Sequence, residues 1–328
     1  MQYDKPFKTY SEQIEHLNIE YNLTIDDIEL ATALLSTFSY YDLINGYKDC
    51  FMVNNKYITG TTIEDLYVFN QIDKDIQNLL FKYSVIVENR FKTILAYHVS
   101  KQFGVDISNY VSLNVLNHKK AYESKKVIDD LNKITTSTYC QQPTKHYRDF
   151  KNHIPAWILF KNATFSTTIN YFMLLSLNLR NQISQDLYTR SYDCSDEEML
   201  NFITSSLKIV KKFRNVIAHN LKFVSTRSKD FLILKHLSKE YSGNLILRSD
   251  NNNNIGKNDP YSMIIALITL LNENFLIQNF INDFGRLLYV LEDSFGKTLI
   301  QDYFKHCHLP NDLEKRLKNY LTKIQSKI

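Results

Sequence analysis

The sequence predicts an all-α protein, and three observations support this fold class. Only 7 glycines and 5 prolines occur among 328 residues, which disfavours a turn-rich β architecture. Apolar residues recur at three- and four-residue steps over long stretches, as they do on the packed face of a helix. Residues that start helices precede several of these stretches. Because 44% of the residues are hydrophobic, the chain can also bury a substantial core.

Helix starts are predicted where a hydroxyl residue precedes a glutamate by three positions, since the two side chains then satisfy free backbone groups of the first turn. Three such capping boxes are Thr9 with Glu12, Thr61 with Glu64, and Ser195 with Glu198. The periodic segment after Thr61 predicts a helix of roughly ten turns or fewer. The segment after Ser195 predicts a second long helix that ends at about Leu221.

The last third of the chain predicts further helices within residues 262–295 and 312–325. A loop is expected at about 243–260, because its asparagine run and glycines offer little to bury. These elements divide the chain into an N-terminal helical region, residues 1–55, and a helical core, residues 56–328.

Several function classes lack support in the sequence. Neither a Walker-type loop nor a G-x-G-x-x-G run occurs, so no nucleotide cofactor, and no other cofactor, is expected. The longest apolar run, residues 263–271, is too short to cross a bilayer, and the first ten residues lack the apolar core of a secretion signal. A net charge of +4 permits a polyanionic partner without requiring one. Scattered cysteines indicate free thiols in a reducing cytoplasm: Cys50, Cys140, Cys194 and Cys307.

The stretch KKFRNVIAHN, residues 211–220, places an arginine and a histidine five positions apart in the second long helix. At 100° per residue, Asn215 and His219 share one face with four lysines, all within about 100° of arc. These lysines form a basic strip: Lys208, Lys211, Lys212 and Lys222. Arg214 instead falls on the apolar seam of the helix, where a leucine or isoleucine would pack.

A guanidinium in an apolar seam is unfavourable unless it is paired or faces a cleft, so two interpretations stand. In the first, Arg214 pairs with a carboxylate of a neighbouring helix and His219 is an ordinary histidine. In the second, Arg214 holds the phosphate of an RNA and His219 moves protons while the 2′-hydroxyl attacks, so no metal is needed. The spacing alone does not decide, because Arg148 and His153 form a second such pair in a predicted loop.

Three other features need an interpretation. Glu88 and Lys92 predict an intrahelical ion pair, with a contact to RNA or to the motif helix as the alternative. Trp157 is predicted to anchor the core. No metal site is predicted, because the candidate ligands in KHCHLP lack a companion pair at a zinc-binding spacing: His306, Cys307 and His308.

RNVIAH, residues 214–219, resembles the R-N-x-x-x-H signature of the HEPN superfamily, whose helical bundles include many metal-independent endoribonucleases. Four further blocks resemble the Abi-like family, which comprises the AbiD and AbiF abortive-infection proteins of bacteria, with AbiF the more similar branch. In chain order they are KPFKTYSEQIEHL (5–17), LLSTFSYYDLINGY (34–47), VENRFKTILAYHVS (87–100) and HIPAWILFKNATFSTTINYF (153–172). The resemblance implies a HEPN-type bundle with extra N-terminal helices.

The resemblance also implies a ribonuclease that arrests or kills a phage-infected cell, with a small structured noncoding RNA as partner. Arg214 and His219 would be the catalytic pair, and Asn215 would orient the histidine or the phosphate. Because acid–base cleavage needs two proton-transfer groups and each chain has one such motif, a homodimer with a composite site is expected. Two alternatives remain open: a non-catalytic RNA-binding module, and a toxin–antitoxin scaffold that acts through a partner protein.

Overall fold

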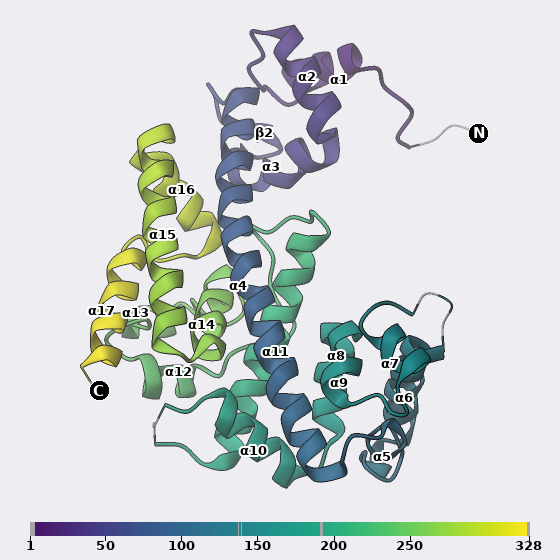
Figure 1. Cartoon of the computed structure of the whole chain (residues 1–328). Coiled ribbons are helices and arrows are strands. Elements are labelled where there is room, and N and C mark those ends of the chain that lie inside the picture. Colours follow the sequence, from purple (N-terminus) through teal and green to yellow (C-terminus); the bar gives the residue numbers. More distant parts are fainter. Residues whose placement is uncertain (1–3, 137, 139, 191–192, 327–328) are drawn as a thin grey trace.

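One long helix, α4, forms the axis of the molecule (Figure 1). In the computed structural model it comprises 41 residues, from Ile63 to Phe103. The structure describes residues 4–136, 138, 140–190 and 193–326. The all-α prediction is confirmed, since the other elements are helices apart from one short hairpin.

The N-terminal region lies at the N-terminal end of α4 (Figure 1). Its elements are α1 (Tyr10–Ile19), α2 (Ile28–Phe38), the π-helix η1 (Tyr41–Asn45), α3 (Gly46–Phe51), β1 (Met52–Val53) and β2 (Lys56–Tyr57). The two strands pair antiparallel, and Asn54 and Asn55 form the turn between them. Both asparagines have positive φ angles, 52° and 60°, as a two-residue type I′ turn requires.

The middle of the chain forms a group of short helices, most of which gather near the C-terminal end of α4 (Figure 1). They are α5 (Ile107–Tyr110), the 3₁₀ helix η2 (His118–Lys120), α6 (Ala121–Thr136), α7 (Thr144–Phe150), α8 (Ala156–Asn162), α9 (Phe165–Leu174) and α10 (Leu177–Leu187). Among these, α8 and α10 pack directly against α4.

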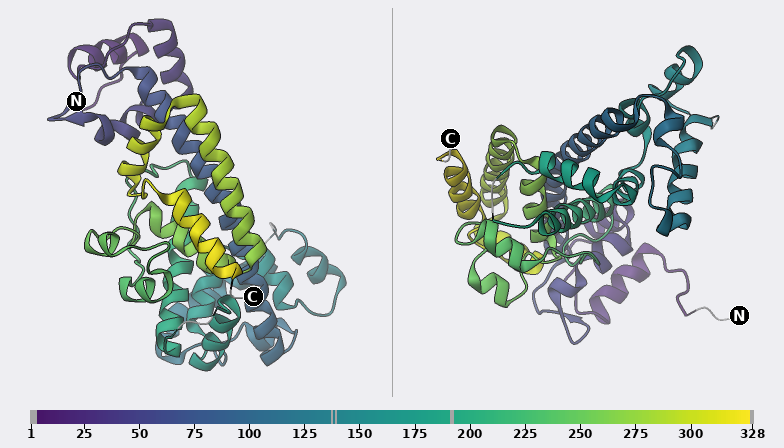
Figure 2. Two further views of the ribbon diagram at one scale, coloured as in Figure 1. Left: turned by 90° about the vertical axis from the view of Figure 1, so that its left-hand side faces the viewer. Right: turned by 90° about the horizontal axis from the view of Figure 1, so that it is seen from below.

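The C-terminal third surrounds one fully buried helix. Its elements are α11 (Asp196–Ala218), α12 (Leu234–Tyr241), α13 (Arg248–Asn252), α14 (Pro260–Leu271), α15 (Asn274–Phe295), α16 (Lys297–Cys307) and α17 (Leu313–Gln325). Every residue of α14 is buried, and the helix packs against α4 and α11. A helix covered on all sides has no need of a polar face, which explains its almost entirely apolar sequence. Two further views show α15 running alongside α4 (Figure 2).

Several element boundaries differ from the prediction. The capping boxes at Thr9 and Ser195 are confirmed. The cap of α4 is Thr62 with Asp65, one residue later than predicted. That helix is also longer than ten turns, because apolar side chains continue to be buried one turn after another up to Val99.

Two predictions about burial are wrong. The segment 243–260 is not a plain loop, because it contains α13 and buries Leu245 and Asp250. The carboxylate of Asp250 forms an ion pair with Arg316 of α17, which holds this segment against the core. Trp157 is 50% exposed and is no core anchor. The buried face of α8 begins at Ala156, and the next residue is turned about 100° away from it.

Candidate functional site

The motif helix, α11, has well-defined ends that place His219 at its C-terminus. At the start, the backbone N–H of Ser195 donates to Glu198, which holds the pKa of that carboxyl below its usual range. At the end, Asn220 adopts a left-handed conformation with φ of 53°. Hydrogen bonds from Leu221 N–H to the Val216 carbonyl and from Asn220 N–H to the Ile217 carbonyl, 2.9 and 3.0 Å long, complete a Schellman motif.

This C-terminal cap determines the environment of His219. The residue is the C-cap of α11, so its backbone already leaves helical geometry at φ −98° and ψ 14°. Its side chain is exposed and forms no hydrogen bond or ion pair with another described residue. An exposed imidazole that is not engaged by a neighbour is free to accept or donate a proton.

Arg214 lies at the edge of the packed face of α11, not at its centre. Its side chain is 30% exposed, and its guanidinium carbon lies 5.7 Å from the centre of the Phe81 ring on α4. Its Nη1 donates to Oδ1 of Asn215 over 3.2 Å. Its Nη2 lies 3.5 Å from Oε2 of Glu88, a residue of α4. The guanidinium is therefore anchored on one side and partly open to solvent on the other.

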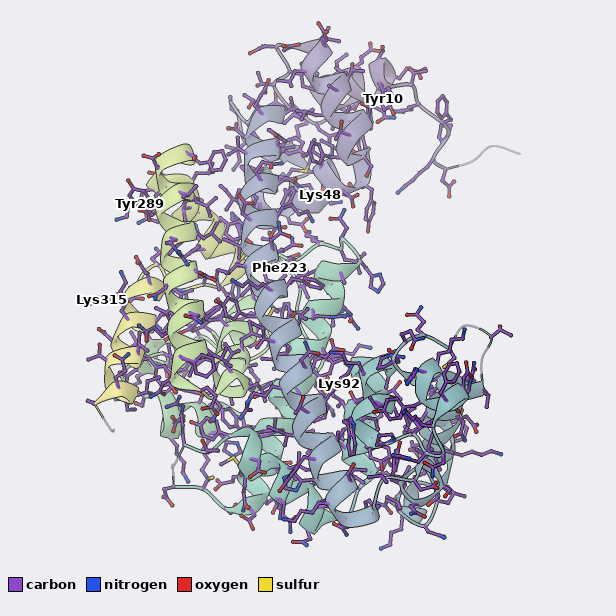
Figure 3. All side chains as sticks on the ribbon, viewed as in Figure 1. Tyr10, Lys48, Lys92, Phe223, Tyr289 and Lys315 are labelled. Carbon is purple, nitrogen blue, oxygen red and sulfur yellow. The ribbon has the colours of Figure 1, made fainter. Side chains whose placement is uncertain are left out.

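Glu88 connects the two helices of the site. Its side chain is only 12% exposed, and its Oε1 forms an ion pair with Lys92 Nζ at 2.7 Å. The same Lys92 ammonium donates to the Ala163 carbonyl, just before α9, also over 2.7 Å. Figure 3 labels Lys92 on the side of α4 that faces the short helices of the middle of the chain. The predicted intrahelical pair is confirmed, and the alternative contact to the motif helix is present as well. One carboxylate thus faces two cations, which leaves a net positive charge at this point.

The structure corrects the predicted apolar seam of α11. Leu200, Ile203 and Val210 are buried as expected. Leu221, however, lies beyond the helix and is 51% exposed. The packed face is wider than the seam and is centred closer to Phe213, so Arg214 borders it instead of occupying a packed slot.

The basic strip is only partly available. Lys211 is half-buried and Lys212 is exposed, and neither forms an ion pair with a described residue. Lys208 lies 3.4 Å from Asp230. Lys222 follows the end of α11, so its predicted position on the helix face is wrong.

Lys222 instead connects the end of the motif to the N-terminal region. Its Nζ lies 2.6 Å from Oδ2 of Asp49 on α3. The hydrogen bond from this ammonium holds the pKa of Asp49 below its usual range. The sequence contains no local signal for this contact, because the two residues are 173 positions apart.

The other sequence candidates do not assemble into a site. Arg148 belongs to α7 and pairs with the neighbouring Asp149, while His153 lies in the loop before α8. His306 packs edge-on near Phe69, and burial raises the pKa of Cys307 well above its usual value. In the described ranges no group of three or more His, Cys, Asp or Glu side chains is placed to hold a metal ion. All four cysteines are free thiols, as predicted.

Comparison with known proteins places the motif inside a recognised family. The Abi-like protein family matches residues 33–224, a segment that runs from α2 to just beyond His219. No curated protein and no solved structure matches the chain. Within the described residues, no helix has both the length and the apolar character that spanning a membrane requires. Because the matched segment covers more than half of the chain and includes α4, α11 and the whole RNVIAH motif, the chain belongs to the Abi-like family.

Proposed function

We propose that this protein is a metal-independent endoribonuclease of the HEPN superfamily, most similar to the AbiF branch, that acts in the cytoplasm of phage-infected bacteria. Membership of the Abi-like family suggests an abortive-infection antiphage protein. One observation carries the enzymatic part of the proposal. An unpaired, exposed imidazole at His219 follows a partly exposed guanidinium at Arg214 by little more than one helical turn.

In the proposed reaction, the RNA supplies its own nucleophile. The 2′-oxygen forms a bond to phosphorus while the bond from phosphorus to the 5′-oxygen of the next nucleotide breaks. The proton lost from the 2′-hydroxyl goes to a general base, and a general acid protonates the departing 5′-oxygen. The products are a 2′,3′-cyclic phosphate and a 5′-hydroxyl, and His219 serves as one of the two proton-transfer groups.

Arg214 is assigned to the phosphate. Its Nη2 faces Glu88, which fixes the plane of the guanidinium, and the exposed edge can donate hydrogen bonds to phosphate oxygens. Asn215 accepts from Arg214 Nη1 and so helps to hold this orientation. Lys211 and Lys212 supply additional positive charge for the RNA backbone.

A homodimer supplies the second proton-transfer group. Each chain presents one exposed motif histidine, and two motifs around one phosphate would provide both an acid and a base. We expect activity per chain to fall when the protein is diluted below its dimerisation constant. Light scattering and cleavage rates measured over the same dilution series test this, and a fully active monomer contradicts it.

RNA cleavage by the purified protein tests the proposed function. Total RNA from phage-infected cells should be cut in the presence of EDTA, because the chemistry uses no metal. The new 3′ ends should resist poly(A) polymerase until a phosphatase that opens cyclic phosphates is added. Cleavage that stops with EDTA, or products with free 3′-hydroxyls, would rule out the mechanism.

RNA binding without cleavage is a second candidate function. It is favoured by the ion pair between Arg214 and Glu88, because a paired arginine can hold two helices together without taking part in catalysis. Under this function a noncoding RNA occupies the basic strip and no strand is cut. A discrete RNA that co-purifies with the protein, combined with no cleavage of any added RNA, distinguishes the two. Under the proposed nuclease function, the same noncoding RNA controls the activity.

A further inference from the structure

The N-terminal region contains a large groove that plays no part in the chemistry proposed above. Its volume is ≈ 1290 Å³, and its walls come from residues 4–8, α1, η1, α3 and the turn between β1 and β2. Its lining mixes aromatic rings, lysines and asparagines. A groove with this lining is neither an apolar packing cavity of the core nor a binding site for a small ion.

Aromatic rings line one part of the groove. Tyr21, Tyr40 and Tyr41 contribute to the wall, and Tyr41 is 71% exposed. The His16 ring, which also lines the groove, packs edge-on against Tyr21 with 5.0 Å between ring centres. Exposed aromatic faces in a groove are the platforms on which unpaired bases stack.

The charged residues of the groove favour a polyanion. Three lysines line it, Lys5, Lys8 and Lys48, together with two carboxylates, Asp4 and Asp49. Asp49 is already engaged by Lys222. The lysines therefore exceed the available carboxylates, and a nucleic-acid backbone that tracks the groove would be attracted to them.

Asparagine side chains complete the lining. Asn54 and Asn55 both face the groove, and neither side chain hydrogen bonds to another described residue. A side-chain amide offers a donor and an acceptor, which suits the edges of unpaired bases.

A second cavity lies between the groove and the residues that follow the motif helix. This small cavity of ≈ 40 Å³ shares Tyr41 and Asn45 with the groove. Its wall also includes Asn220 and Lys222, the first of which directly follows His219 in the chain. A strand lying in the groove would therefore lie next to the residues that directly follow the exposed imidazole.

We propose that the N-terminal groove binds a single-stranded flank of the RNA that is cleaved, with Tyr41 stacking on a base and Lys8 and Lys48 holding phosphates. This inference rests on the proposed nuclease function for the identity of the strand. A duplex fits less well, because its bases are stacked on one another and cannot reach the tyrosines. An acidic peptide fits less well, because it has no flat faces for an aromatic platform.

Binding of a labelled oligouridylate 12-mer tests the groove without cleavage when it is measured in the His219→Ala background by fluorescence anisotropy. Tyr41→Ala should weaken binding about five- to tenfold through the lost stacking. Lys48→Glu should weaken it to a similar degree and lower the slope of log affinity against log salt by about 0.7. Unchanged affinity in both variants overturns the proposal.

Matched controls lie on the C-terminal helices. Tyr289 on α15 is 74% exposed, close to the exposure of Tyr41, and Lys315 on α17 is an exposed lysine, and both are labelled away from Lys48 in Figure 3. Tyr289→Ala and Lys315→Glu should bind the 12-mer like the parent protein. An equal loss in these variants would mean that binding is a general surface effect, which contradicts the proposal.

Two comparisons distinguish single-stranded RNA from other possible occupants of the groove. A blunt 20-base-pair RNA duplex should bind Tyr41→Ala and the parent equally well, and a tenfold loss for the duplex overturns the single-strand assignment. Polyglutamate should not compete with the 12-mer. Competition that disappears in the Tyr41→Ala variant identifies a peptide site instead.

Cleavage rates distinguish a failed groove from a failed nuclease. With His219 restored, Tyr41→Ala should raise KM for the 12-mer and leave cleavage of a dinucleotide unchanged, because only the longer strand reaches the groove. Equal effects on both substrates mean that the residue acts on the catalytic site, which contradicts the proposal. Loss of 12-mer binding in Tyr41→Ala without any cleavage by the parent supports the groove and refutes the nuclease.

Discussion

Replacing His219 with alanine is expected to reduce RNA cleavage by orders of magnitude and leave the fold intact. The imidazole is exposed and forms no hydrogen bond with another described residue, so its loss removes no structural contact. A general acid or base in the transition state contributes about 10² to 10⁴-fold to a rate. We expect a loss within this range in single-turnover cleavage, with a melting temperature within about one degree of the wild type.

Two further variants at the site should reduce the rate of RNA cleavage by different amounts. Arg214→Ala should reduce cleavage by about 10²-fold, because a charged donor to the phosphate is lost. Glu88→Gln should cause a smaller loss, about tenfold, since Arg214 remains but is no longer held by an ionised carboxylate. It should also destabilise the fold by about 1 kcal/mol, because it leaves the mostly buried Lys92 without its charge partner.

His153→Ala is the matched control for His219, the proposed catalytic histidine. It belongs to the second arginine–histidine pair but lies in a loop before α8, where its ring contacts Asn152. Cleavage by this variant should equal that of the wild type. If His219→Ala still cuts RNA at the wild-type rate, or His153→Ala is the inactive variant, the assignment of the motif is wrong.

Replacing Asp73 with alanine is expected to destabilise the protein strongly. Asp73 is 1% exposed on α4 and joins three elements. It accepts hydrogen bonds from Tyr47 of α3 over 2.9 Å, from Gln77 over 2.6 Å and from Tyr303 of α16 over 2.7 Å. Alanine would leave these buried donors without a partner, so we expect a loss of about 3 kcal/mol in the free energy of unfolding.

The ionisation of Asp73 predicts how the stability difference between wild type and Asp73→Ala depends on pH. Burial raises its pKa above the ordinary value, although the three hydrogen bonds act in the opposite direction. A carboxyl whose pKa is raised in the folded state stabilises the fold most below its unfolded pKa, about 3.9, and this contribution is lost as the pH rises through the folded value. The difference in stability between wild type and Asp73→Ala should therefore grow as the pH falls from neutrality toward about 4.

Asp75→Ala is the matched control for Asp73. It lies two residues further along α4 but is exposed, and its side chain makes no hydrogen bond to another described residue. Chemical denaturation at several pH values should show less than about 0.5 kcal/mol of change for this variant. Equal stability of the Asp73→Ala and Asp75→Ala proteins would contradict the role of the buried network.

Element types were predictable because they depend on local chemistry. Capping residues such as Ser195 satisfy backbone groups only a few positions away, and apolar steps follow the helical repeat. Boundaries were less predictable. Thr61 and Thr62 both offer a hydroxyl, and only the contacts around the start of α4 select Thr62 as the cap.

Two arginines show which contacts cannot be predicted from local sequence patterns. Arg90 and Arg214 both occur among apolar residues at helical spacing in the sequence, yet they have different surroundings. The Arg90 guanidinium donates to the Leu187 carbonyl over 2.8 Å and to the Asp186 carbonyl over 3.0 Å, so it caps the end of α10. Arg214 instead borders solvent beside Glu88.

By itself, the sequence determined the helical class of the protein, the family to which it belongs, and the motif that joins Arg214, Asn215 and His219. These follow from patterns within one helix or from the order of short blocks along the chain. Only the tertiary structure decided that Glu88 faces Arg214, that Lys222 reaches Asp49, and that the N-terminal helices leave a groove between them. The two ion pairs join residues more than a hundred positions apart, and all three features depend on how whole helices pack, which no local periodicity encodes.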